Sequence, residues 1–172
     1  MINVIVIPAF NEEKHIKAIL KKTKTFCKNI IVVDDGSSDN TYNTALTEDV
    51  IVLRLPVNMG KGVALKTGCD FALKLNANKI VVMDADGQHN PCQIPKFLKE
   101  LDEVDIVFGY RVLGQSMPYI LRLGNNFINN VVNILFKVKL KDTQSGFRSF
   151  TSKAYKKVRW QSQDYSMESE MI

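Results

Sequence analysis

Short apolar runs alternate along the chain with segments whose apolar residues recur at helical spacing. The runs are rich in Val and Ile and too short for buried helices, which favours strands. Helical spacing is clear where Ile16, Ile19 and Leu20 share one face. Pro8 is expected to end the first strand. The pattern predicts strands at 2–7, 30–33, 50–55, 79–83 and 105–109, and helices at 11–24, 39–46, 61–75, 91–101 and 119–136.

Strands of this kind, separated by helices, are typical of a parallel sheet that helices cover on both faces. We therefore expect an α/β fold of the doubly wound, Rossmann-like type. In such sheets, ligands bind beyond the carboxyl ends of the strands. Polar clusters follow the first four predicted strands, so we expect the ligand site at that edge of the sheet. These clusters lie at 8–12, 34–41, 58–62 and 84–89.

The length and charge of the chain narrow the classes of protein to which it can belong. Its 172 residues suit one domain with a substantial core. The net charge of +5 suits an anionic partner, either a phosphate ligand, a nucleic acid or an acidic membrane surface. The lysines are interspersed with acidic residues and lack an aromatic platform, so nucleic-acid binding is disfavoured.

The cysteines and the apolar stretches bear on location. Cys27, Cys69 and Cys92 form no CxxC pair, so we expect neither a disulfide framework nor a zinc site. No apolar stretch reaches the length of a membrane span, and the N-terminus lacks the regions of a signal peptide. We expect a protein of the reducing cytoplasm, or one held peripherally on the cytoplasmic face of a membrane.

Asp84 and Asp86 follow the fourth predicted strand with one residue between them. Alternation along an extended chain points both carboxylates to the same side. Mg²⁺ and Mn²⁺ prefer such hard oxygen ligands, and Gln88 and His89 add further possible ligands. A helix N-terminus ahead of Pro91 also favours Asp and Asn, so a metal site and a capping region are equally compatible with these residues.

Asp34 and Asp35 end the second predicted strand, ahead of a turn and a helix start. Ser38 or Asp39 can cap that helix, which explains most of the turn by structure alone. Two adjacent carboxylates repel each other and contribute little to a turn. Either of them can instead accept hydrogen bonds from a base edge or a ribose hydroxyl.

Lys61 lies between two glycines at the start of a helix. The glycines allow close backbone approach, and a helix N-terminus attracts anions, so a phosphate site and a simple tight turn are both possible. Arg148 presents a similar choice between a bidentate contact with phosphate and a pair with a surface carboxylate.

The predicted helix at 119–136 has apolar residues on one face and several Asn residues on the other. A helix that packs on the core explains this pattern. A helix that lies in a membrane interface is the alternative, although such helices usually carry Lys and Arg. A lipid substrate would favour the second interpretation, with peripheral membrane contact.

Taken together, these stretches resemble family 2 glycosyltransferases of the GT-A fold over nearly the whole chain. The last motif and Gln88 are most similar to the polyprenyl-phosphate branch, which includes dolichol-phosphate mannosyltransferases. The resemblance implies a single GT-A catalytic domain at 1–172, from which the C-terminal part of the family domain is missing. The matching stretches are 8–12, 33–39, 58–62, 84–89, 109–111 and 142–148.

The resemblance implies a reaction and a set of partners. An inverting transferase would move a hexose, such as mannose or glucose, from a GDP- or UDP-sugar to polyprenyl (dolichyl) phosphate. It would use Mg²⁺ or Mn²⁺, which neutralises the charge that builds on the leaving diphosphate.

The resemblance also implies roles for individual residues. Residues expected to bind the nucleotide sugar are Pro8, Ala9, Asn11, Glu12, Asp34, Asp35, Lys61, Asp84, Ala85 and Asp86. The expected metal ligands are Asp86, Gln88 and Asp84. The expected catalytic residues are Asp86, Arg111, Asp142 and Arg148, and the expected acceptor-binding residues are Arg122 and Arg148.

The acceptor is open at this point. A lipid phosphate is already ionised and needs no general base, whereas a sugar hydroxyl needs one, for which Asp142 is the first candidate. Transfer to a sugar hydroxyl of a glycan or glycolipid is therefore an alternative. A non-catalytic subunit that binds a nucleotide sugar is another. Arg122 lies one place earlier than the arginine of the related sequences.

Overall fold

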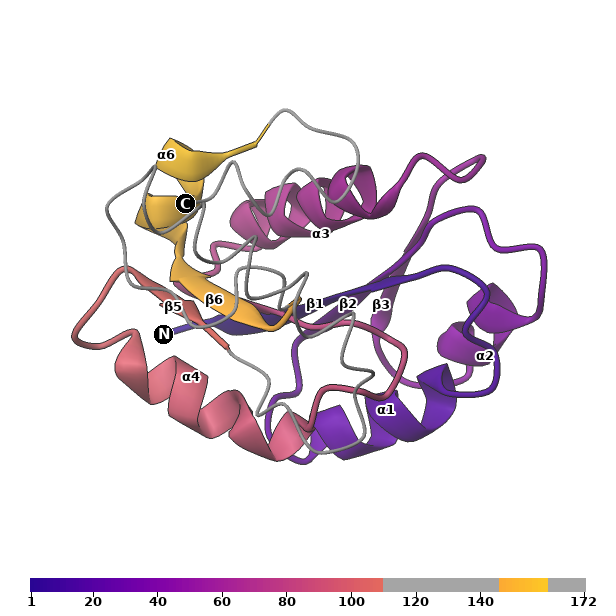
Figure 1. Ribbon diagram of the computed structural model, residues 1–172, viewed down its shortest axis with the longest axis horizontal. Helices are drawn as coiled ribbons and strands as arrows, with labels where there is room; N and C mark the ends of the chain where they lie inside the picture. Colours follow the sequence, from indigo (N-terminus) through magenta and orange to yellow (C-terminus); the bar gives the residue numbers. More distant parts are fainter. Residues whose placement is uncertain (110–145, 161–172) are drawn as a thin grey trace, which may run out of the picture.

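A computed structural model describes residues 1–109 and 146–160, which contain one six-stranded sheet between two layers of helices (Figure 1). The strand order is β3-β2-β1-β4-β6-β5. The strands are β1 (Asn3–Ala9), β2 (Ile30–Asp34), β3 (Ile51–Arg54), β4 (Lys79–Val82), β5 (Ile106–Phe108) and β6 (Arg148–Thr151). The helices are α1 (Ile16–Lys24), α2 (Thr41–Leu46), α3 (Lys61–Lys74), the 3₁₀ turn η1 (Pro91–Gln93), α4 (Ile94–Glu100) and α6 (Ser152–Val158).

The predicted α/β class and mostly parallel sheet are confirmed. β1 pairs in parallel with β2 and β4, and β2 pairs in parallel with β3. β6 lies between β4 and β5 and runs antiparallel to both, with Phe150 opposite Ile80 and Ile106. The sequence analysis predicted no strand there, because four residues with a polar start carry little periodic signal.

Two predicted boundaries are wrong, each for a physical reason. β1 continues through Pro8, which is opposite Val33 of β2. Pairing with β4 ends at Val6, so Pro8 lies where that neighbouring ladder has stopped and a missing N–H is tolerated. Helix α1 begins at Ile16 and not at Asn11, because Asn11 has φ 55° and starts a turn instead.

The core consists of two clusters, one on each face of the sheet. Side chains alternate along β1, so Val4 and Val6 face one cluster while Ile5 and Ile7 face the other. α3 and α6 cover the first face, and α1 and α4 cover the second (Figure 1). At Gly68, a Cβ atom would be 2.4 Å from Cγ1 of Val6, so α3 packs directly on the sheet.

The segment that follows β6 is attached to α3 through polar contacts. The Arg159 guanidinium donates two hydrogen bonds to the Asp70 carboxylate, at 2.9 and 2.6 Å, and the Tyr155 hydroxyl donates a third at 2.8 Å. The Trp160 indole N–H donates to the Gly62 carbonyl at 3.0 Å. Within the described ranges, no helix has the length and apolarity needed to cross a membrane.

Asp70 gives a pH-dependent test of this attachment. Burial raises the pKa of its carboxyl, but hydrogen bonds from Arg159 and Tyr155 outweigh burial and hold that pKa below its usual value. The ionised Asp70 carboxylate therefore stabilises the folded state fully at pH values above the unfolded-state pKa of about 3.9. This stabilisation is lost as the pH falls through the lower pKa that Asp70 has in the folded state. Asp70→Asn should lower the free energy of unfolding by about 1 kcal/mol or less at pH 7, because the pair is partly exposed.

Urea unfolding of the parent and of Asp70→Asn across this range measures the effect. The difference between the two proteins should shrink as the pH falls below about 3.9. Asp49→Asn, a change at an exposed aspartate, is the control. A difference that stays constant with pH would contradict the assignment.

Two glycines with positive φ give a matched test of how the loops pack. Gly36 (φ 68°) follows β2, and a Cβ there would be 2.4 Å from the backbone carbon of Val57. Gly87 (φ 79°) follows β4, and a Cβ there would meet nothing within 4 Å. Gly87→Ala should cost about 1–2 kcal/mol for the backbone conformation alone. Gly36→Ala should cost about 1–3 kcal/mol more, because the Val57 backbone must move. Equal losses in urea unfolding would refute the close loop contact.

Candidate functional site

Four loops follow the four parallel strands at the carboxyl edge of the sheet, where the sequence predicted the ligand site. The loop after β1 is tied to the loop after β2 by hydrogen bonds. The backbone N–H of Asn11 donates to Oγ of Ser37 at 2.9 Å, and the side-chain oxygen of Asn11 accepts from the Ser38 N–H at 2.9 Å. The Glu12 N–H donates to Oγ1 of Thr41 at 2.7 Å. Asn11 and Glu12 therefore lie beside the β2–α2 turn, as a shared site requires.

Asp35 connects the end of β2 to the loop before α3. Its side chain is buried, and its two oxygens accept hydrogen bonds from the N–H groups of Met59 (2.8 Å) and Gly60 (3.0 Å). Its backbone N–H donates to the carbonyl of Ala9 at 2.8 Å. Asp35 thus links the end of β2 to the end of β1 through its backbone and to the loop before α3 through its carboxylate.

Asp34 is fully buried at the end of β2. Nε of Arg54 lies 3.2 Å from its Oδ2, and no donor in the described part of the chain is aligned for a hydrogen bond to either oxygen. The Arg54 guanidinium also donates to the Ser37 carbonyl at 3.1 Å and lies over the Tyr42 ring. The charge of Asp34 is therefore balanced by an arginine from β3.

Lys61 and Asp84 form an ion pair between the start of α3 and the end of β4. Nζ of Lys61 lies 2.8 Å from Oδ1 and 3.0 Å from Oδ2 of Asp84, and both side chains are largely buried. Gly146 packs against the same carboxylate so closely that a Cβ atom would be 2.2 Å from Oδ2. Asp84 is thus enclosed by a cation on one side and by backbone on another.

The loop after β4 has its own internal order. The backbone N–H of Asp84 donates to Nδ1 of His89 at 3.0 Å, so this nitrogen is an acceptor. Oδ1 of Asp86 accepts from the N–H of Gln88 at 2.9 Å. Ala85 is buried, Asp86 is half-buried and Gln88 is exposed. Of the two predicted carboxylate ligands, Asp84 is the one whose ion pair with the Lys61 ammonium is described above.

Three aromatic rings, those of His89, Phe147 and Phe97, stack in series beside this loop. The sequence analysis did not predict this stack. The His89 ring stacks on Phe147 with centroids 5.1 Å apart, and Phe147 stacks on Phe97 at 4.3 Å. Gly146 and Phe147 belong to a stretch that carried the family resemblance but had no assigned role. Only the long-range pairing of β6 with β4 brings them to this edge.

Of the remaining predicted site residues, some lie within the described part of the chain and others lie outside it. Arg148 lies on β6 opposite Val82, is 1% exposed, and has its guanidinium 5.3 Å from the centre of the Phe108 ring. Pro8 and Ala9 are buried at the end of β1, beside β2. Arg111, Arg122, Asp142 and the predicted helix at 119–136 lie outside the described residues.

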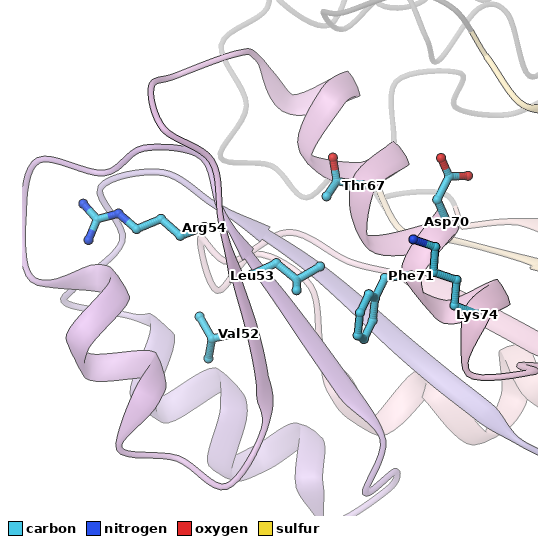
Figure 2. A pocket seen from close by; sticks show the side chains of 7 residues that line it. All are labelled: Val52, Leu53, Arg54, Thr67, Asp70, Phe71 and Lys74. Atoms are coloured by element: carbon cyan, nitrogen blue, oxygen red, sulfur yellow. The ribbon is translucent and has the colours of Figure 1, made fainter.

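Acidic groups at this edge do not gather into one cluster. Within 1–109 and 146–160, no three His, Cys, Asp or Glu side chains are grouped so that they could hold a metal ion. A groove of about 540 Å³ lies beside the edge strand β3, lined by Val52, Leu53, Arg54, Thr67, Asp70, Phe71 and Lys74 (Figure 2). Through Arg54 it borders Asp34 and Ser37.

Comparison with known proteins gives the family from the sequence and a shared fold from the structure. The sequence pattern described as "Glycosyl transferase family 2" matches residues 4–159. The uncharacterized protein MJ1222 of Methanocaldococcus jannaschii is 40% identical, with 98% of this chain and 73% of that protein covered. The UDP-N-acetylglucosamine–dolichyl-phosphate N-acetylglucosaminyltransferase of Methanococcus voltae is 34% identical, with 88% of this chain and 70% of that protein covered.

Among solved structures, the fold is similar to glucosyl-3-phosphoglycerate synthase of Mycobacterium tuberculosis in a complex with Mn²⁺, UDP and glucosyl-3-phosphoglycerate. The TM-score is 0.79 at 19% identity, and the match covers 99% of this chain and 63% of that one. The chain therefore spans less than two thirds of this structural neighbour. Because the family pattern matches residues 4–159, nearly the whole chain, the chain belongs to glycosyl transferase family 2.

Proposed function

We propose that this protein is an inverting glycosyltransferase that moves a hexose from a GDP- or UDP-sugar to polyprenyl phosphate. The observation that carries the proposal is the family match over 4–159 together with a relative, from Methanococcus voltae, named for transfer to dolichyl phosphate. Residues 1–172 would then be one GT-A catalytic domain. It would work in the cytoplasm or on the cytoplasmic face of a membrane.

The donor would bind across the carboxyl edge of the parallel strands, as ligands do in open α/β sheets. The hydrogen bonds of Asn11, which donates to Ser37 and accepts from Ser38, support this, because they bring two of the proposed nucleotide-binding loops together. Asp35 would hold the wall of the nucleoside pocket. Pro8, Ala9, Glu12 and Asp34 would line or support the same wall.

Asp86, with Asp84 and Gln88, would hold Mg²⁺ or Mn²⁺. Their hard oxygens suit these ions, which usually share their coordination sphere with substrate phosphates. When bound, the ion neutralises the charge that develops on the leaving nucleoside diphosphate. Asp86 would be the principal protein ligand, because the Lys61 ammonium already balances the Asp84 charge. Ala85 would space the two carboxylates along the loop.

Lys61 would keep Asp84 oriented and would place positive charge near the diphosphate. The ammonium lies at the N-terminus of α3, where backbone N–H groups also favour an anion. Arg148, Arg111 and Arg122 would face phosphate groups of the donor or the acceptor. For Arg148, the supporting observation is its position on the strand beside β4, opposite Val82, two residues before Asp84.

With polyprenyl phosphate as the acceptor, the attacking oxygen is already ionised. The chain then has to orient the phosphate and exclude water, and it needs no general base. Asp142 would act as an orienting residue and not as a base.

The metal role is tested with Asp86→Asn, which keeps the shape of the side chain and its hydrogen bond from Gln88. Transfer should fall by roughly 10³-fold or more, because a metal ion supplies several kcal/mol of charge stabilisation. Metal-dependent nucleotide binding, followed by calorimetry, should be lost with it. The thermal midpoint should stay within a few degrees of the parent value, and Asp49→Asn should behave as the parent does in every assay. Parental turnover in Asp86→Asn would exclude this residue as a ligand.

The acceptor is tested by supplying radiolabelled GDP- and UDP-hexoses with polyprenyl phosphate in detergent, or with soluble sugars. Label should enter the lipid extract and not the soluble sugars. Asp142→Asn should change turnover by only a few-fold, whereas loss of a general base costs roughly 10²–10⁴-fold. A large loss together with labelled soluble product would identify a sugar hydroxyl as the acceptor.

A further inference from the structure

The positive charge of this protein is concentrated in one short stretch. The whole chain has 23 Lys and Arg against 18 Asp and Glu. The segment 14–28 holds six lysines and no acidic residue, so the rest of the chain has 17 basic against 18 acidic residues. The net charge of +5 therefore comes entirely from the segment that forms α1 and its flanks. These lysines are Lys14, Lys17, Lys21, Lys22, Lys24 and Lys28.

The fold turns this segment into a single basic face. Ile16, Ile19, Leu20 and Thr23 are the buried residues of α1 and pack toward the sheet. Lys17, Lys21 and Lys22 lie on the side of the helix away from these residues, and Lys24 lies on its flank. The lysines are exposed, apart from the half-buried Lys24. We call this outer surface, from Lys14 to Lys28, the α1 basic face. Helix α1 lies in the same helical layer as α4 (Figure 1).

The acidic side chains near the α1 basic face neutralise little of its positive charge. Lys24 pairs with Glu48 at the end of α2, at 3.4 Å. Glu12 binds His15 at 2.7 Å, and Glu13 accepts from the Asn40 N–H at 2.9 Å, so both are engaged at the edge of the sheet. Within the described ranges, the other five lysines of the face take part in no ion pair. Like charges one turn apart, as at Lys17 and Lys21, weaken a helix unless something else compensates.

An apolar side chain accompanies the lysines. Phe26 follows α1 between Lys24 and Lys28 and is 37% exposed. Lysines beside an exposed aromatic ring suit the surface of an anionic bilayer, where the ammonium groups meet lipid phosphates and the ring enters the interface.

We propose that the α1 basic face docks this protein on an anionic lipid surface. The choice of a bilayer over another polyanion rests on the proposed function, because an enzyme that glycosylates polyprenyl phosphate must reach a lipid. The face is also well placed for that task. Lys14 and Lys17 lie at the end of α1 that adjoins Glu12, so a bilayer held there borders the carboxyl edge of the sheet.

The test compares two triple variants that remove equal charge. Lys17→Gln, Lys21→Gln and Lys22→Gln together remove half of the lysines of the α1 basic face. Lys153→Gln, Lys156→Gln and Lys157→Gln together remove three exposed lysines from α6, in the opposite helical layer, and serve as the control. Binding is measured by co-sedimentation with vesicles of phosphatidylcholine alone, or of equal parts phosphatidylcholine and phosphatidylglycerol, all without polyprenyl phosphate.

The parent should bind only the vesicles that contain phosphatidylglycerol, and less tightly as salt rises. Each lysine near such a surface contributes roughly fivefold in affinity, so the α1 variant should lose about 100-fold and the control variant much less. Equal losses in the two variants, or no binding by the parent, would overturn the proposal. Tighter binding of the parent to duplex DNA than to these vesicles would replace the bilayer by a nucleic acid.

A second measurement separates this proposal from the proposed function. Transfer to a short-chain, detergent-dispersed polyprenyl phosphate should be the same in the α1 variant and the parent, because these lysines lie outside the proposed site. If neither protein transfers sugar but the vesicle result is as expected, docking stands and the proposed acceptor is wrong. If transfer occurs and the vesicle result fails, the docking proposal alone is overturned. Matching thermal midpoints show that both variants are folded.

Discussion

The start of α3 is held between two carboxylates, and this clamp organises the whole carboxyl edge of the sheet. Asp35, at the end of β2, accepts from the Gly60 N–H, while the next residue, Lys61, reaches Asp84 at the end of β4. Trp160 adds a third attachment at the Gly62 carbonyl. Three consecutive residues are thus fixed by three different parts of the fold. Because each partner is buried or partly buried, these contacts hold the start of α3 in a defined position at the edge of the sheet.

Asp35 shows that one carboxylate can hold a loop in place and also be available to a ligand. Asp35 has a structural role that its sequence context did not suggest, since it binds two backbone amides of a loop more than twenty residues away. Such a contact does not compete with ligand binding, because each carboxylate oxygen can accept more than one hydrogen bond. A substitution at this position would therefore alter the loop and the pocket together.

The apolar periodicity of the sequence predicted much of the fold. The parts that it did not predict depend on pairing between strands that are far apart in the sequence. The buried strands and the amphipathic helix α1 carry local patterns, so the sequence predicted the strands that contain Ile5 and Val32 and the apolar helix face that contains Leu20, all of which lie in the core. Strand β6 carries almost none, since its identity as a strand depends on β4 and β5 on either side. The contacts of Gly146 with Asp84, and of Phe147 with His89, depend on that same pairing. The run of lysines at 14–28 is visible in the sequence, but only the structure shows which of them lie on the solvent-exposed side of α1.

The position of β6 has a consequence for how the protein is made. β5 is joined to the rest of the sheet through β6, although it precedes β6 along the chain. During synthesis, Ile106, Val107 and Phe108 must therefore wait as an unpaired apolar segment until residues 148–151 have left the ribosome. Contacts between such distant residues form slowly, because a long loop has to close first. The four parallel strands can assemble early, whereas the two strands β5 and β6, which bring Gly146 and Phe147 to the site, are completed last. This region is therefore the natural point of dependence on chaperones.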